Sequence, residues 1–259
     1  MKRVYKRLEE PEYLKKYREE NPQESWEHFR RRVRKGYRQV KKAILEDQCG
    51  LCAYCEISIK FAEHENEIDD FRVEHFYPKT GTNEKEHNYH LDWNNLLGVC
   101  HGGSQRDVPN AEWRFSNVKR DRSCDVPKGS KEITKRILNP MQIPAEVRLF
   151  KYAEHTGRMY VDEETCPEKL QKKARNTIKE LNLNAPRLMR MRKAAIRKLD
   201  EEVAANLQEG MELEEAMEYL AEVFLCKDWQ GNYLPFFTVI RWYLGGYAEK
   251  ALEKMAYKI

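Results

Sequence analysis

Apolar residues recur every three or four positions in the first part of the chain, and charged residues fill the positions between them. The recurring positions are Trp26, Phe29, Val33, Tyr37, Val40 and Ile44. This spacing predicts an amphipathic helix that buries one face and ends near Asp47. The pattern reaches back to Pro11, but Asn21 precedes Pro22 and would fit poorly in a helix. We therefore expect a break there, with Ser25 capping the second piece.

After Gly50 the apolar runs become short and lie between loops. Residues 71–76 read as a strand, and residues 147–152 with 157–161 read as a hairpin. From residue 166 onward the helical spacing returns. It predicts four helices, at 167–181, 186–208, 212–226 and 235–257, the last interrupted at Gly245 and Gly246.

These patterns predict an α+β fold with N-terminal helices, a small irregular core and a C-terminal helical bundle. We place the divisions at 1–48, 49–163 and 164–259. Charged residues make up 35% of the chain, and no stretch approaches 18 consecutive apolar residues, so we expect no membrane span. The basic start of the chain has no apolar stretch behind it, which argues against an export signal.

The net charge of +4 is too small to indicate a nucleic-acid-binding protein by itself. The charges are unevenly distributed, however, because residues 200–222 hold nine acidic side chains and no basic one. There are seven cysteines, and in a reducing cytoplasm, where we expect the protein, these are free thiols or metal ligands.

Cys52 and Cys55 have the C-x2-C spacing at which two thiolates converge on one zinc ion. A buried pair of ordinary thiols is the simpler alternative. Cys49 stands at the same spacing before Cys52, which leaves the register of the pair ambiguous. Downstream, Cys100 and Cys124 would complete a set of four sulfurs for a closed tetrahedral site.

Other polar residues lie between and beside these cysteines at characteristic distances. Glu74 and His75 are followed by Pro78 and Lys79, Asn95 precedes Cys100 at N-x4-C spacing, and Cys124 opens Cys124-Asp125-x-x-Lys128. This combination resembles the zinc-stapled HNH endonucleases, also called ββα-metal nucleases. Together with Asp92-Trp93-Asn94-Asn95-Leu96-Leu97 and Leu181-Asn182-Leu183-Asn184, it is similar to the HNH subunit of Septu-type antiphage systems, a family that also occurs with some retrons.

The resemblance implies a zinc-stapled ββα-metal core that hydrolyses phosphodiester bonds. His75 would be the general base, since a neutral imidazole can take a proton from water. Asn95 would support the loop that orients His75. Glu74 and Asp125 would hold Mg²⁺, or Mn²⁺ in the test tube, because hard cations prefer carboxylate oxygens.

The structural Zn²⁺ would be held by Cys52, Cys55, Cys100 and Cys124. The family usually closes its site with a second C-x2-C, whereas here 24 residues separate Cys100 from Cys124. His101 is therefore an alternative to Cys124 as fourth zinc ligand, or to Asp125 as a ligand of the catalytic metal. We favour Cys124 because the residues after it keep the family pattern.

Basic residues surround the predicted site, and we expect Lys79, Arg120, Arg122 and Lys128 to contact the nucleic acid. The resemblance also implies partners: duplex DNA in preference to RNA, and an ABC/SMC-like ATPase or a retron reverse transcriptase with its msDNA. The chain has no Walker A motif, so ATP dependence would come from the partner.

Three functions stay open on the sequence. The first is the metal-dependent endonuclease, acting on DNA or alternatively on RNA, including tRNA. The second is a catalytically inactive, zinc-dependent nucleic-acid-binding module. The third is a thiol or redox enzyme that uses Cys49, Cys52 and Cys55.

Overall fold

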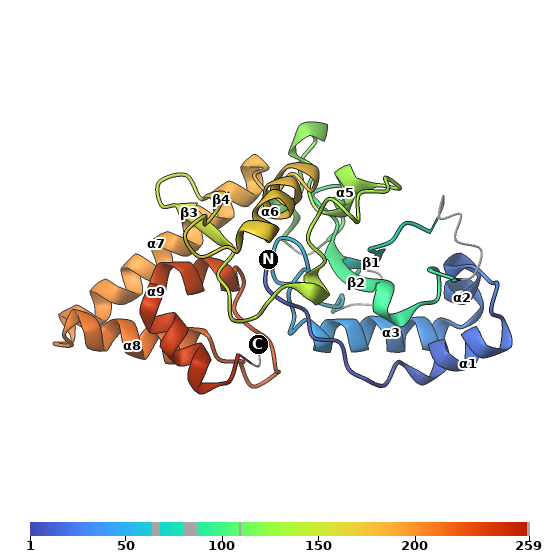
Figure 1. Cartoon of the computed structure of the whole chain (residues 1–259), viewed down its shortest axis with the longest axis horizontal. Helices are drawn as coiled ribbons and strands as arrows, with labels where there is room; N and C mark the ends of the chain where they lie inside the picture. The colour runs from blue at the N-terminus through green and yellow to red at the C-terminus, as the bar shows by residue number, and fades with distance from the viewer. Residues whose placement is uncertain (64–67, 80–86, 109, 258–259) are drawn as a thin grey trace.

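The computed structural model describes residues 1–63, 68–79, 87–108 and 110–257. Helices α1 to α3 lie at one end of the long axis and helices α7 to α9 at the other (Figure 1). The described residues form two small antiparallel sheets: β1 with β2 packs beside α3, and β3 with β4 packs beside α9. The fold is therefore α+β, as the sequence predicted. Within the described ranges, we find no helix that is both long enough and apolar enough to span a membrane.

The N-terminal helices are α1 (Glu12–Glu20), α2 (Trp26–Arg32) and α3 (Arg34–Asp47). The break near Pro22 is confirmed, and the Ser25 hydroxyl caps α2 by accepting a hydrogen bond from the His28 amide at 3.1 Å. The sequence did not predict a second break at Val33, where the backbone leaves the helical region with φ −117° and ψ 62°. The spacing of apolar residues continues unchanged across Val33, so the spacing could not reveal this break.

The predicted strand is β1 (Phe71–His75), which pairs antiparallel with β2 (Leu96–Cys100). Strand β2 was not predicted because all five of its residues are buried, so it shows no alternation of apolar and polar positions. The insertion after β2 contains α4 (Ala111–Arg114), and Cys124 is followed by α5 (Asp125–Lys128). The described residues of this region also form three single turns of 3-10 helix: η1 (Trp93–Asn95), η2 (Lys119–Asp121) and η3 (Pro140–Gln142).

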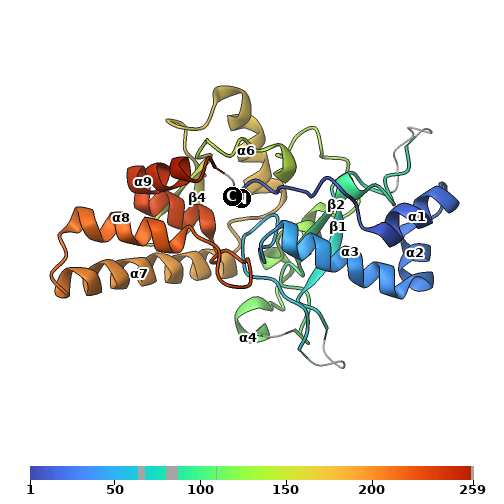
Figure 2. The same ribbon diagram turned by 90° about the horizontal axis from the view of Figure 1, so that it is seen from below.

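The predicted hairpin is confirmed as β3 (Phe150–Ala153) and β4 (Arg158–Val161). The four predicted C-terminal helices are also present, and they are α6 (Glu168–Glu180), α7 (Pro186–Gln208), α8 (Leu213–Phe224) and α9 (Phe237–Lys254). Helix α9 is kinked where predicted, because Gly245 adopts φ 55° and ψ −124°. Helix α7 begins near the middle of the molecule and runs outward to meet α8 at the far end (Figure 2).

Candidate metal centre and catalytic site

Four cysteines from three separate segments form one buried cluster. The ligand atoms of Cys52, Cys55, Cys100 and Cys124 all lie within 4.8 Å of one another. The Sγ atom of Cys100 is 3.6 Å from that of Cys55 and 3.6 Å from that of Cys124. Tetrahedral zinc with Zn–S bonds of about 2.3 Å separates its sulfurs by about 3.8 Å. The four thiols therefore fit a structural metal such as zinc.

The local backbone explains how the cluster assembles. Cys52 and Cys55 lie on a turn that the Cys52 amide closes on the Ile57 carbonyl at 2.9 Å. Cys100 is the last residue of β2, and its amide donates to the Sγ atom of Cys52 at 3.3 Å. The Gly102 amide donates to the Sγ atom of Cys100 at 3.4 Å. Backbone N–H groups directed at sulfur favour the thiolate form that binds a metal.

The two ambiguities left by the sequence concern Cys49 and His101. Neither residue belongs to the cluster that the described part of the chain forms. Cys49 is buried elsewhere, in the apolar cluster beneath the C-terminal helices. The His101 ring is engaged with the Asp69 carbonyl, with 2.8 Å between Nε2 and oxygen. The geometry thus groups Cys124, and not His101, with the other three sulfurs.

His75 ends β1 and is buried, with 5% of its surface exposed. Its Nε2 atom lies 3.0 Å from the His90 carbonyl oxygen. A carbonyl only accepts hydrogen bonds, so Nε2 carries the proton and the neutral ring keeps its lone pair on Nδ1. Burial lowers the pKa of His75 to about 3, and the ring is therefore neutral at neutral pH.

The Asn95 side chain holds the loop around His75 together. Its Oδ1 atom accepts from the Tyr77 amide at 2.6 Å, and its Nδ2 atom donates to the carbonyls of Tyr77 at 3.0 Å and Tyr89 at 2.9 Å. Tyr77 follows His75 by two residues in the chain. Tyr89 directly precedes His90, whose carbonyl oxygen contacts the His75 ring. Asn95 thus fixes both sides of the histidine at once.

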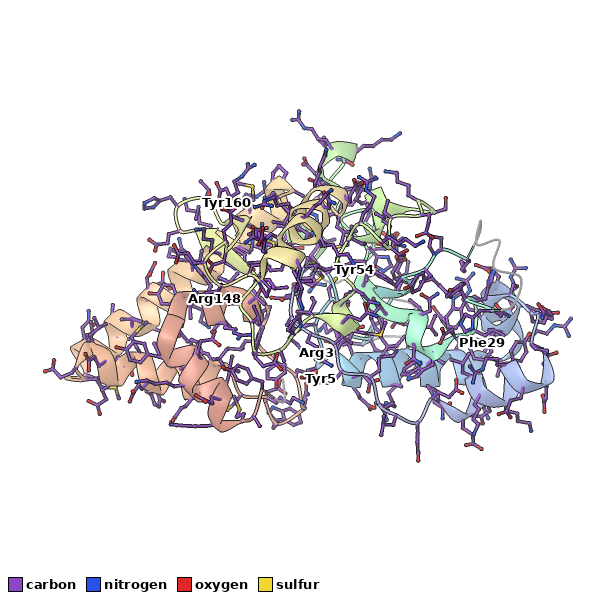
Figure 3. All side chains as sticks on the ribbon, in the orientation of Figure 1. Arg3, Tyr5, Phe29, Tyr54, Arg148 and Tyr160 are labelled. Atoms are coloured by element: carbon purple, nitrogen blue, oxygen red, sulfur yellow. The ribbon has the colours of Figure 1, made fainter. Side chains whose placement is uncertain are left out.

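The two predicted metal-binding carboxylates are held in internal ion pairs. Lys128 Nζ lies 2.7 Å from Glu74 Oε1, and Arg72 Nε lies 2.6 Å from Asp125 Oδ2. Tyr54, which Figure 3 labels beside the strands, donates its hydroxyl to Glu74 at 3.4 Å. Asp125 Oδ1 is buried and has no hydrogen-bond partner among the described residues. Such an orphaned oxygen suits a cation as its missing partner.

Burial raises the pKa of Glu74, Lys128 lowers it, and the charge of Asp125 raises it further. Burial likewise raises the pKa of Asp125, and Arg72 opposes this rise. The two carboxylates therefore affect each other, and a shared cation would relieve both their repulsion and their desolvation.

The four basic residues predicted to bind nucleic acid occupy different environments. Lys128 is 1% exposed and also donates to the His75 carbonyl at 3.0 Å, so the structure places its ammonium inside the site and away from the surface. Lys79 forms an ion pair with Glu27. The Arg120 side chain is 88% exposed. The Arg122 guanidinium lies 5.3 Å from the centre of the Phe115 ring.

Sequence reasoning missed Arg72, Tyr54 and the His90 carbonyl as parts of the site. Arg72 could have been found, since it lies two residues before Glu74 and a strand directs alternate side chains to the same face. Tyr54 stands inside the C-x2-C turn, where any aromatic residue reads as core. The sequence could not indicate a role for the His90 carbonyl, because every residue has a backbone carbonyl.

The chain is similar to a known protein over most of its length. It is 33% identical over 212 residues to a protein of Escherichia coli described as "Retron Ec83 putative HNH endonuclease". The matched region covers 74% of this chain and 78% of the relative. No protein-family model matches the chain.

Proposed function

Because the chain belongs to the family of HNH endonucleases related to the retron Ec83 protein, we propose that it is a metal-dependent nuclease that hydrolyses phosphodiester bonds. In this proposal β1, β2 and α5 form a reduced ββα-metal motif, and Zn²⁺ on the four cysteines staples it. The observation that carries the proposal is the environment of His75. A neutral, buried imidazole whose Nε2 is fixed on a carbonyl has the lone pair that a general base requires.

His75 takes the proton from the attacking water in this mechanism, and Asn95 keeps the ring oriented by clamping the residues on either side of it. Glu74 and Asp125 hold the divalent cation, Mg²⁺ or Mn²⁺, and the unpartnered Oδ1 of Asp125 supports this assignment. When bound, such a cation neutralises charge on the phosphate and on the leaving oxygen. Lys128 and Arg72 position the two carboxylates from within the protein.

We propose that Lys79, Arg120 and Arg122 contact backbone phosphates, since a positive charge near the site attracts any nucleic acid. Duplex DNA is the substrate we favour, and RNA, including tRNA, is the alternative, because phosphate contacts carry no base information. By its resemblance to Septu-type systems, we also propose an antiphage role in the cytoplasm beside an ABC/SMC-like ATPase or a retron complex.

The test is a cleavage assay on plasmid DNA and on total RNA with Mg²⁺ or Mn²⁺. It compares wild type with His75→Ala, and with His155→Ala as a matched control, because His155 is exposed and lies outside the site. Removing a general base typically costs about 10²- to 10⁴-fold in rate. We expect such a loss for His75→Ala, and wild-type cleavage for His155→Ala.

The same proteins are assayed alone and with an ABC/SMC-like ATPase, the proposed partner. Equal cleavage by wild type and His75→Ala would exclude the proposed mechanism. Binding of nucleic acid without any cleavage, lost in Cys52→Ser, would instead favour the inactive zinc-dependent module. Less than one zinc per chain in the purified protein would revive the thiol or redox alternative.

A further inference from the structure

Arg187, in the first turn of α7, is a buried guanidinium that lacks the partners such a group normally has. It is 1% exposed, and its Nη2 atom donates to the Ser123 hydroxyl. Its Nε and Nη1 atoms are buried without any hydrogen-bond partner in the described part of the chain. A buried charge with two unpaired N–H groups is costly unless another charge is close.

Two other arginines are buried in the part of the chain that the structure describes, and they show what a paired guanidinium looks like in this protein. Arg192 donates to the carbonyls of Gly157 at 2.7 Å and Leu183 at 2.8 Å. Arg241 binds both carboxylate oxygens of Glu249, at 2.8 and 2.6 Å. Arg187 therefore differs from both in having no carbonyl or carboxylate on it within the residues that the structure describes.

The surroundings of Arg187 are the four-cysteine cluster. Ser123 accepts a hydrogen bond from Arg187, and its hydroxyl oxygen lies 3.4 Å from the Sγ atom of Cys124. Arg187 and Cys100 line the same small cavity.

The loop after Cys100 is shaped to admit this guanidinium. Gly103 adopts φ +85°, and a Cβ atom there would lie 2.8 Å from Arg187 Nε. Any other residue at this position would therefore press on the guanidinium and would also strain the backbone. The absence of a side chain at Gly103 therefore leaves room for the Arg187 guanidinium.

We propose that Arg187 is the buried counter-charge of the four-thiolate metal centre, and that its Nε–H and Nη1–H groups are the donors available to the sulfurs. Zinc with four thiolates carries a net charge of −2, which is expensive to bury, and one guanidinium halves it. Arg187 belongs to α7, whereas the four cysteines belong to the core, so the attraction between them joins the two parts. Zinc binding and the docking of α7 onto the core therefore stabilise each other.

The experiment measures zinc release from the full-length protein with a chromogenic chelator at fixed pH. It compares wild type, Arg187→Met, Arg187→Lys and Arg241→Met. Arg241→Met is the matched control because it also removes a buried guanidinium, in α9 and paired with Glu249. Loss of a group in the outer shell of a metal typically costs 10- to 100-fold in affinity.

We expect zinc to leave Arg187→Met about 10- to 100-fold faster than wild type, and Arg187→Lys to be intermediate. Arg241→Met should release zinc at the wild-type rate even if its fold is less stable. Equal acceleration in Arg187→Met and Arg241→Met, or none in Arg187→Met, would overturn the proposal.

A second measurement covers the case in which Arg187→Met fails to fold. Co²⁺ is substituted for zinc in wild type and in Arg187→Lys, and the sulfur-to-cobalt charge-transfer band is recorded. A guanidinium that interacts with the thiolates lowers their donor strength, so the band should shift in Arg187→Lys and remain in place in Arg241→Lys. An unchanged band in Arg187→Lys would contradict the proposal.

Discussion

Between α3 and α6 the chain combines an apolar core with a cysteine cluster and with side chains that bind the backbone, whereas α8 and α9 are held mainly by apolar side chains that pack on one another. The first region has strands of four or five residues and helices of three or four. Asn95, Lys128 and the cysteine cluster add tertiary connections to its apolar core. The second region buries residues such as Leu220, Phe237 and Leu252 in a separate cluster, to which the first region contributes Cys49, Leu51 and Ala145.

The difference shows where apolar packing is useful and where directed hydrogen bonds and metal ligands are useful. Apolar packing is tolerant of small shifts, and it suits a region that supports the rest of the molecule. A catalytic geometry must be held within fractions of an ångström, which directed hydrogen bonds and metal ligands achieve. We therefore expect the two regions to respond differently to the same kinds of damage.

Removal of the metal should cause the largest difference between the responses of the two regions. In Cys100→Ser, or after chelation of wild type, the core loses a ligand set whose binding contributes on the order of 10 kcal/mol in small zinc domains. Hydrogen exchange followed by mass spectrometry should show protection lost around Cys100 and at the start of α7, and retained in α8 and α9. Cys226→Ser, at an exposed cysteine of the helical region, is the control and should match wild type.

The reciprocal damage is a cavity in the helical region. Leu220 of α8 is 1% exposed, and Leu220→Ala should lower the free energy of unfolding by about 2–5 kcal/mol, from lost burial and the cavity left behind. Zinc content per chain should remain that of wild type, as elemental analysis would show. Loss of zinc from Leu220→Ala would mean that the two regions unfold as one unit.

A finer comparison uses two asparagines that make equivalent clamps. Asn184 accepts from the Met159 amide at 2.8 Å and donates to the Met159 carbonyl at 2.9 Å, as Asn95 does with Tyr77. Either change to alanine leaves buried backbone groups unpaired and should cost about 2 kcal/mol in chemical denaturation. Nuclease activity should fall only in Asn95→Ala. A similar fall in Asn184→Ala would mean that the loss of activity follows from lower stability and not from the position of Asn95 beside His75.

The smallest effect is a pH dependence that arises from His75. Its folded pKa, about 3, lies below the unfolded value of about 6.5, so the unfolded chain binds more protons between these values and stability falls as the pH falls. From pH 6.5 to 5 this group alone should remove about 1.5 kcal/mol. Denaturation of His75→Gln should show a correspondingly weaker dependence, and parallel curves for the two proteins would contradict the assignment.

The fold was predictable where the chain repeats a period. Helices α6 to α9 and the β3–β4 hairpin follow from apolar spacing and turn residues, because their pattern is local. Strand β2 and the break at Val33 were missed because one is wholly buried and the other leaves the spacing unchanged. The division of the chain into three domains stays a prediction.

The sequence alone determined which residue types and spacings were present: the C-x2-C pair, Glu74 with His75, Asn95 before Cys100, and Cys124 with Asp125. Only the tertiary structure decided that Cys124 joins the other sulfurs, that Lys128 is turned inward onto Glu74, and that Arg187 stands beside the cluster. These outcomes depend on segments far apart in the chain meeting in a low-dielectric interior. The burial of these side chains and their charge pairing depend on tertiary contacts between distant segments, which the order of residues alone does not specify.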